Sequence, residues 1–121
     1  MLTKLEVFEK VRNHLLTQNR RCSTESEGCR LRDDCGNKCA VGCLIDDKFY
    51  RETLEHNSEI ELGDTNVELQ DALINSGVPF KECKYLLKDL QILHDTTPVP
   101  QWESELNLLK AKLVKTGEIN E

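Results

Sequence analysis

Apolar residues recur at helical spacing in four stretches of the chain. In the first stretch, Thr3 and Glu6 form a capping box, in which each side chain accepts a hydrogen bond from the backbone of the other residue. The apolar stripe behind this box consists of Leu5, Phe8, Val11 and Leu15. The pattern predicts a helix that begins at Thr3 and ends near residue 18, and the polar residues 19–28 predict a loop.

The other three helical stretches lie in the second half of the chain. A second capping box, Thr65 with Glu68, and a typical helix stop at Gly77 predict a short helix. The strongest pattern follows Pro79 and ends before the prolines at 98 and 100, with an apolar face made of Phe80, Cys83, Leu87, Leu90 and His94. The last helix carries Trp102, Leu106, Leu109 and Leu113, and residues 116–121 after it are expected to fray.

The segment between the first two helices has a different pattern. Around residues 29–32, apolar Cys29 and Leu31 alternate with basic residues, which is the period of a half-buried strand. Residues 33–37 have turn chemistry, and residues 38–45 are expected to return as the second strand of a hairpin. A helix starting there is the alternative, because Cys39 and Cys43 stand four residues apart and would share a helical face.

These elements predict an α+β fold, with three or four helices packed around a small antiparallel β-hairpin. The 121 residues suit a single domain, 1–121, that can bury a core without help from disulfides or metal. The sequence contains no internal repeat or linker that would indicate a second domain.

Charge and hydropathy narrow the classes of partner. The formal net charge of −6 argues against general nucleic-acid binding and favours a basic protein surface as partner. No apolar run approaches the roughly 20 residues needed to cross a bilayer, and the N-terminus lacks the features of a secretory signal. We therefore expect a cytoplasmic protein with reduced cysteines and no membrane contact.

Five of the six cysteines lie close together in the sequence, at positions 22–43. Four of them, Cys29, Cys35, Cys39 and Cys43, are candidate zinc ligands and would make the protein a small zinc-stabilised module. The CxxC pairs of typical zinc sites are missing, so we expect neither a metal nor another cofactor. Free cysteines also fill small buried spaces as modest hydrophobes.

Cys39 and His94 form a candidate catalytic pair, a nucleophile with a general base. Against this interpretation, His94 lies on the apolar face of its predicted helix near the C-terminal end, where a capping or core-edge role is more common. Asp95, its neighbour in the helix, is expected to point elsewhere and to orient His94 poorly.

Arg30, Arg32 and Lys38 form a candidate binding patch for a phosphate or an acidic partner. The alternative is that these charges only solvate the outer face of the hairpin and protect its edge. No phosphate-binding glycine loop, HExxH, GxSxG or EF-hand loop is present in the sequence.

The sequence contains C-x-[YL]-R at residues 29–32, KCAVG-x-LI-x-D-x-x-Y at residues 38–50 and LQxxHD at residues 90–95. These three motifs resemble the pattern of a family of short, uncharacterised bacteriophage and bacterial proteins. The resemblance implies a phage accessory protein that acts in the host cytoplasm, and it places Cys29, Cys39 and His94 in the shared pattern. We therefore expect a non-enzymatic protein that binds and modulates a host macromolecule, with a cysteine-dependent enzyme or a zinc module as the alternatives.

Overall fold

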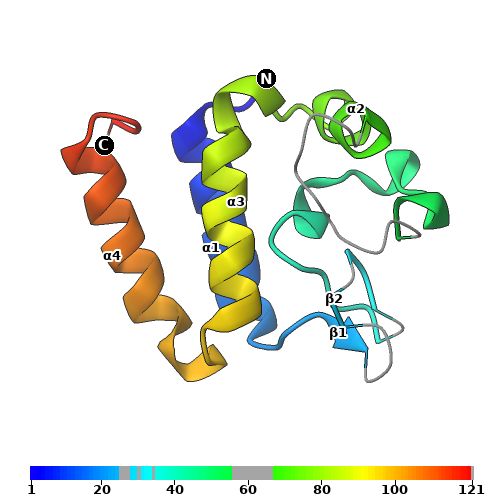
Figure 1. Cartoon of the computed structure of the whole chain (residues 1–121), viewed down its shortest axis with the longest axis horizontal. Coiled ribbons are helices and arrows are strands. Elements are labelled where there is room, and N and C mark those ends of the chain that lie inside the picture. The colour runs from blue at the N-terminus through cyan, green and yellow to red at the C-terminus, as the bar shows by residue number, and fades with distance from the viewer. Residues whose placement is uncertain (25–27, 30, 34, 56–66, 121) are drawn as a thin grey trace.

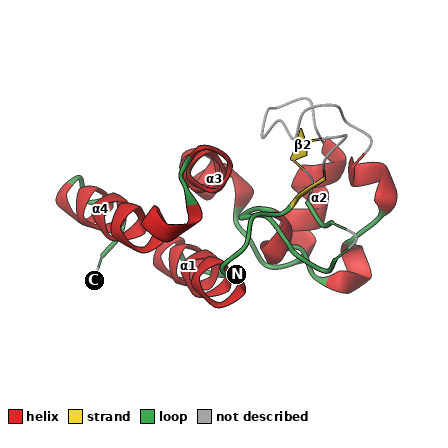
Figure 2. Cartoon of the chain, turned by 90° about the horizontal axis from the view of Figure 1, so that it is seen from below, coloured by secondary structure: helices red, strands yellow, loops and turns green. Residues whose placement is uncertain are grey.

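The computed structural model describes residues 1–24, 28–29, 31–33, 35–55 and 67–120. Four α-helices dominate it: α1 (Lys4–Gln18), α2 (Val67–Asn75), α3 (Phe80–Thr96) and α4 (Trp102–Lys115). Helices α1, α3 and α4 lie side by side and contact one another, while α2 packs against α3 beside the segment that follows α1 (Figures 1 and 2). That segment holds three short 3-10 helices, η1 (Gly42–Leu44), η2 (Asp47–Phe49) and η3 (Glu52–Glu55), and a fourth, η4 (Val99–Gln101), precedes α4.

The helix boundaries follow local sequence chemistry. The capping box at the start of α1 is present, with Glu6 N–H donating to Thr3 Oγ1 and Thr3 N–H donating to Glu6 Oε1. Helix α3 begins directly after Pro79, and its C-cap residue Thr97 precedes Pro98, which cannot continue the helix. The predicted capping residue Thr65 lies outside the described residues.

The prediction of an α+β fold was wrong, because the fold is all-α. In the described part of the chain the only paired strands are β1 (Ser23–Thr24) and β2 (Gly28–Cys29), two residues each, and β1 falls within the predicted 19–28 loop. Among the described residues of the predicted hairpin, 29–45, the pairing is reduced to one isolated bridge, between Arg32 and Lys38. After this bridge the chain coils instead of extending: Cys43 N–H donates to Cys39 O, and Ile45 N–H donates to Gly42 O.

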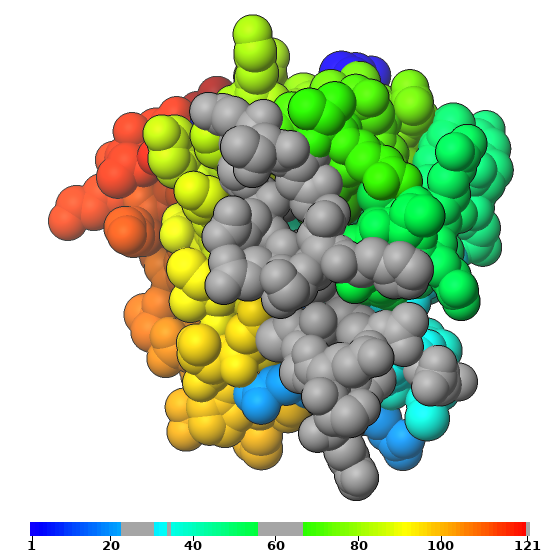
Figure 3. All heavy atoms as spheres, turned by 45° about the vertical axis from the view of Figure 1, so that its right-hand side comes forward, coloured from blue at the N-terminus to red at the C-terminus, as the bar shows by residue number. Residues whose placement is uncertain are grey.

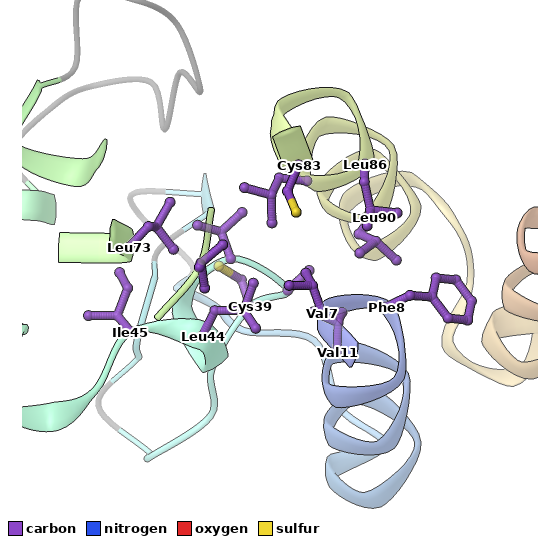
Figure 4. Packing of buried hydrophobic residues seen from close by; sticks show 14 of the residues in the cluster. Val7, Phe8, Val11, Cys39, Leu44, Ile45, Leu73, Cys83, Leu86 and Leu90 are labelled. Atoms are coloured by element: carbon purple, nitrogen blue, oxygen red, sulfur yellow. The ribbon is translucent and has the colours of Figure 1, made fainter. Parts of the chain in front are cut away.

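The core lies between α1, α3 and the coiled segment 39–45. Val7, Phe8 and Val11 of α1 meet Leu86 and Leu90 of α3 (Figure 4). Cys39 and Leu44 of the coiled segment point into the same cluster, with Leu73 of α2 beside them. The coiled segment therefore contributes to the core in place of the predicted hairpin.

The end of the described chain is folded back rather than frayed. Helix α4 ends at Lys115, and Gly117 then adopts a left-handed conformation with φ of 79°. The amides of Glu118 and Ile119 donate to Leu113 O, and the Ile119 side chain is buried. The tail expected to fray over residues 116–121 is thus a closed turn as far as Ile119.

Candidate functional site

His94 lies in the last turns of α3 and is completely buried. Its Nδ1 is 2.8 Å from Asp95 Oδ1, and its Nε2 accepts a hydrogen bond from the Cys22 backbone amide at 3.1 Å. Because Nε2 accepts from an N–H group, the proton of the neutral ring belongs on Nδ1, where it is donated to Asp95. The expectation that Asp95 would orient His94 poorly was wrong.

Gln91 joins this histidine to the cysteine-rich segment, residues 22–43. Its Nε2 donates to Asp95 Oδ1 at 2.9 Å, and its Oε1 accepts from the Val41 backbone amide at 3.1 Å. Sequence reasoning missed Gln91, although a glutamine on an otherwise apolar helical stripe signals a buried polar partner. Through Gln91, two of the three family-like motifs, residues 38–50 and 90–95, meet in space.

Two further side chains close the end of α3. Arg21 donates from Nε to His94 O at 3.0 Å and from a terminal nitrogen to Thr97 O at 2.7 Å, which satisfies carbonyls that the helix leaves unpaired. Trp102 stacks on His94, with ring centroids 5.5 Å apart, and donates from Nε1 to Thr97 O at 3.0 Å. Two parts of the chain, the residues just before β1 and the coiled segment, are therefore held against α3 by four side chains: His94, Gln91, Asp95 and Arg21.

Cys39, the candidate nucleophile, is also completely buried. Its Sγ accepts a hydrogen bond from Gly42 N–H at 3.2 Å, but loss of hydration outweighs that bond and raises the pKa of the thiol well above its usual range. Both ring nitrogens of His94 have partners other than Cys39. In this arrangement, the pair has neither the accessible thiolate nor the unoccupied base that nucleophilic catalysis requires.

The candidate zinc ligands do not converge in the described part of the chain, where no three His, Cys, Asp or Glu side chains could hold a metal ion. Cys35 is exposed on the turn after Asp33, whereas Cys43 is half-buried and donates to Ala40 O. Burial raises the pKa of Cys43 to about 12. The backbone of Cys29 lies in β2, and its side chain is outside the described part of the structure.

Of the candidate basic patch, Arg32 and Lys38 come together and Arg30 lies outside the described residues. Both described cations pair with Asp47, at 2.8 Å from Arg32 and 3.7 Å from Lys38. Arg32 also donates to Ile45 O and stacks over the Tyr50 ring, with 4.2 Å between its Cζ and the ring centroid. Its charge is thus used to hold η2 in place.

Lys38 is fixed through its backbone as well. Its carbonyl bonds to His14 Nε2 at 3.0 Å and accepts from Gln18 Nε2 at 2.9 Å, and its amide donates to Gln18 Oε1. Loss of hydration lowers the pKa of His14, which favours the neutral ring at this junction. The cysteine-rich segment is therefore held by α1 on one side and by α3 on the other.

The chain matches no protein-family model, no curated protein and no solved structure. No helix in the described part of the chain combines the length and apolarity needed to cross a membrane.

Thiol reactivity should follow this burial pattern. When the native protein is treated with iodoacetamide at pH 7, we expect Cys35 to react first, because it is exposed, and Cys39 and Cys43 to react much more slowly. A thiol with a pKa of about 12, that of Cys43, has on the order of a thousandfold less thiolate at neutral pH than one of ordinary pKa. Peptide mapping by mass spectrometry over time measures each rate.

A matched experiment in His94→Ala tests whether His94 activates Cys39. If Cys39 reacted faster than Cys35 in the native protein, and if that reactivity disappeared in His94→Ala, the thiol would be an activated nucleophile. Such a result would favour the enzyme alternative.

Proposed function

We propose that this protein is a small, phage-encoded accessory protein that acts in the host cytoplasm by binding a host protein and modulating it, without catalysis of its own. The observation that carries the proposal is the closed state of Cys39 and His94. The thiol is completely buried with a raised pKa, and both nitrogens of the imidazole are bound within the protein. These groups stabilise the fold, so the side chains that a partner can reach are those on the surface of the protein.

One surface that suits a protein partner is the outward face of α3. Tyr85 is 73% exposed and Ile92 is 58% exposed. Seven residues separate them, so both lie on one face of the helix. Large side chains of this kind, with tyrosine prominent among them, supply much of the binding energy in protein interfaces.

The charge of the chain favours a partner of opposite charge. With a formal net charge of −6, the protein attracts a basic protein surface over distances of about 10 Å at moderate salt. The encounter rate with such a partner should fall as ionic strength rises. The resemblance of residues 38–50 and 90–95 to phage proteins supports a host protein as the partner.

The proposal is tested by capturing the partner with a matched set of variants. Tagged protein is crosslinked in bacterial cells, and the partner identified by mass spectrometry is purified and titrated by calorimetry. We expect Cys39→Ala to bind as the unmodified protein does. The double variant Tyr85→Ser/Ile92→Ser should bind at least tenfold more weakly, because it removes two interface side chains.

Leu108→Ser, on α4, is the control for loss of an exposed apolar side chain, since Leu108 is 64% exposed. It should bind normally. The proposal fails if no host protein is enriched, or if Cys39→Ala abolishes binding while Tyr85→Ser/Ile92→Ser preserves it.

A further inference from the structure

We propose that the hollow between α2 and the η2–η3 segment binds the guanidinium group of an arginine side chain presented by the partner. The inference deepens the proposed function and rests on it, because a basic partner must carry the arginine. In Figure 3, α2 and the segment that holds η2 and η3 lie side by side on one face of the molecule. The hollow between them has a volume of about 240 Å³.

The hollow combines an apolar floor with polar groups at its rim. Phe49, Leu54 and Ala72 are half-buried or buried and give the hollow its apolar floor, whereas the exposed Glu68, Asp71 and Asn75 are the acceptors at its rim. These three acceptors are spaced by three and four residues along α2, so they project from one face of the helix. A long side chain can lie with its methylene groups on the floor while its charged end reaches the rim.

These acceptors are held in position by the protein, but most of their oxygen atoms accept no hydrogen bond from a described residue. Glu68 Oε1 accepts a hydrogen bond from Thr53 Oγ1, which ties α2 to η3 and leaves its other carboxylate oxygen for a ligand. The Asp71 and Asn75 side chains make no hydrogen bond or ion pair with any residue that the structure describes. Two carboxylates and one amide oxygen can therefore receive donors from outside.

Charge and size together point to a guanidinium. Three charged side chains line the hollow, Glu68, Asp71 and Arg51, and their formal charges sum to −1. This net charge matches a single cation and disfavours phosphate or carboxylate ligands. The volume is below the roughly 300–1,000 Å³ of sites for drug-sized ligands and suits one side chain. A guanidinium offers donors in a planar fork that fits carboxylate oxygens.

The test uses N-acetyl-arginine amide as the probe, so that no partner is needed. It is titrated into the ¹⁵N-labelled full chain and followed by amide chemical shifts. We expect shifts at Ala72 and Asn75, with a dissociation constant on the order of a millimolar for so small a ligand. N-acetyl-citrulline amide, a neutral analogue of nearly the same shape, should bind at least fivefold more weakly.

Two double variants, each of which removes two negative charges, distinguish binding in the hollow from long-range electrostatic attraction. Glu68→Gln/Asp71→Asn keeps side-chain size and should weaken arginine binding at least fivefold. Glu103→Gln/Glu105→Gln, on the exposed start of α4, should leave it unchanged. Equal binding of the citrulline amide, shifts away from the hollow, or equal weakening by both variants would overturn the inference.

The outcomes also distinguish this inference from the proposed function. If the arginine amide binds as expected but no host protein is captured, the proposed function fails while the hollow remains a guanidinium site. If a host protein is captured and Glu68→Gln/Asp71→Asn binds it normally, the inference about the hollow fails alone.

Discussion

Gly42→Ala should destabilise the protein by about 3 kcal/mol or more, among the largest losses expected from one added methyl group. A Cβ atom on residue 42 would lie 2.1 Å from the carbonyl oxygen of Leu31 and 2.8 Å from its carbonyl carbon. Leu31 cannot retreat easily, since its oxygen accepts from Cys39 N–H and its amide donates to Glu55 Oε1. Urea unfolding, with the slope compared between variants, measures the loss.

Gly36→Ala is the control for this substitution. Gly36 has a φ of 85°, but a Cβ there would meet no atom within 4 Å. The change should cost about 1–2 kcal/mol, the penalty for an alanine in the left-handed region. If Gly42→Ala cost no more than Gly36→Ala, the close contact between the coiled segment and Leu31 would be contradicted.

Trp102→Ala should destabilise the protein by about 3–5 kcal/mol. The indole is completely buried, stacks on His94 and donates to Thr97 O, so its loss leaves a cavity beside a buried polar network. The measurement is urea unfolding followed by far-UV circular dichroism, because the variant lacks its only tryptophan.

Tyr85→Ala provides the comparison, since it removes an aromatic side chain that is 73% exposed. It should change the free energy of unfolding by no more than about 0.5 kcal/mol. Similar losses for both variants would mean that α4 does not cover the end of α3 as described.

Helix positions were predictable because their signals are local. The capping box of Thr3 and Glu6, the start after Pro79 and the break before Pro98 each act within a few residues, and all three are confirmed. The apolar stripes also identified the buried faces: Phe8, Val11 and Leu90 are all completely buried. The local periodicity of apolar residues determines where such helices lie because it determines which face of the helix is buried.

The coiled segment could not be predicted in the same way. Alternation around Cys29–Arg32 favoured a strand, but the path of residues 38–45 depends on the backbone of Leu31 passing directly over Gly42. That contact joins residues eleven apart and has no periodic signature. A glycine between apolar residues was compatible with a strand, with a helix start and with close backbone packing.

Candidate site residues were identified more readily than their roles. His94 and Cys39 are both buried near the motif junction, but the sequence could not show that the Cys22 amide occupies Nε2 of His94, 72 positions away. Nor could it show that Asp47 pairs with Arg32 and Lys38. Such assignments depend on which donors and acceptors the fold leaves without partners in the interior.

The hydrogen bonds from Val41 to Gln91 and from Cys22 to His94 also set an order of events during synthesis. Their partners lie 50 and 72 residues later in the chain, so the cysteine-rich segment leaves the ribosome well before α3 exists to receive it. At about 5–20 residues per second, a separation of 50 residues is a delay of roughly 3–10 seconds. During that interval the thiols of Cys22 and Cys39, both completely buried in the folded protein, lack the cover of α3 and are open to oxidants and to chaperones.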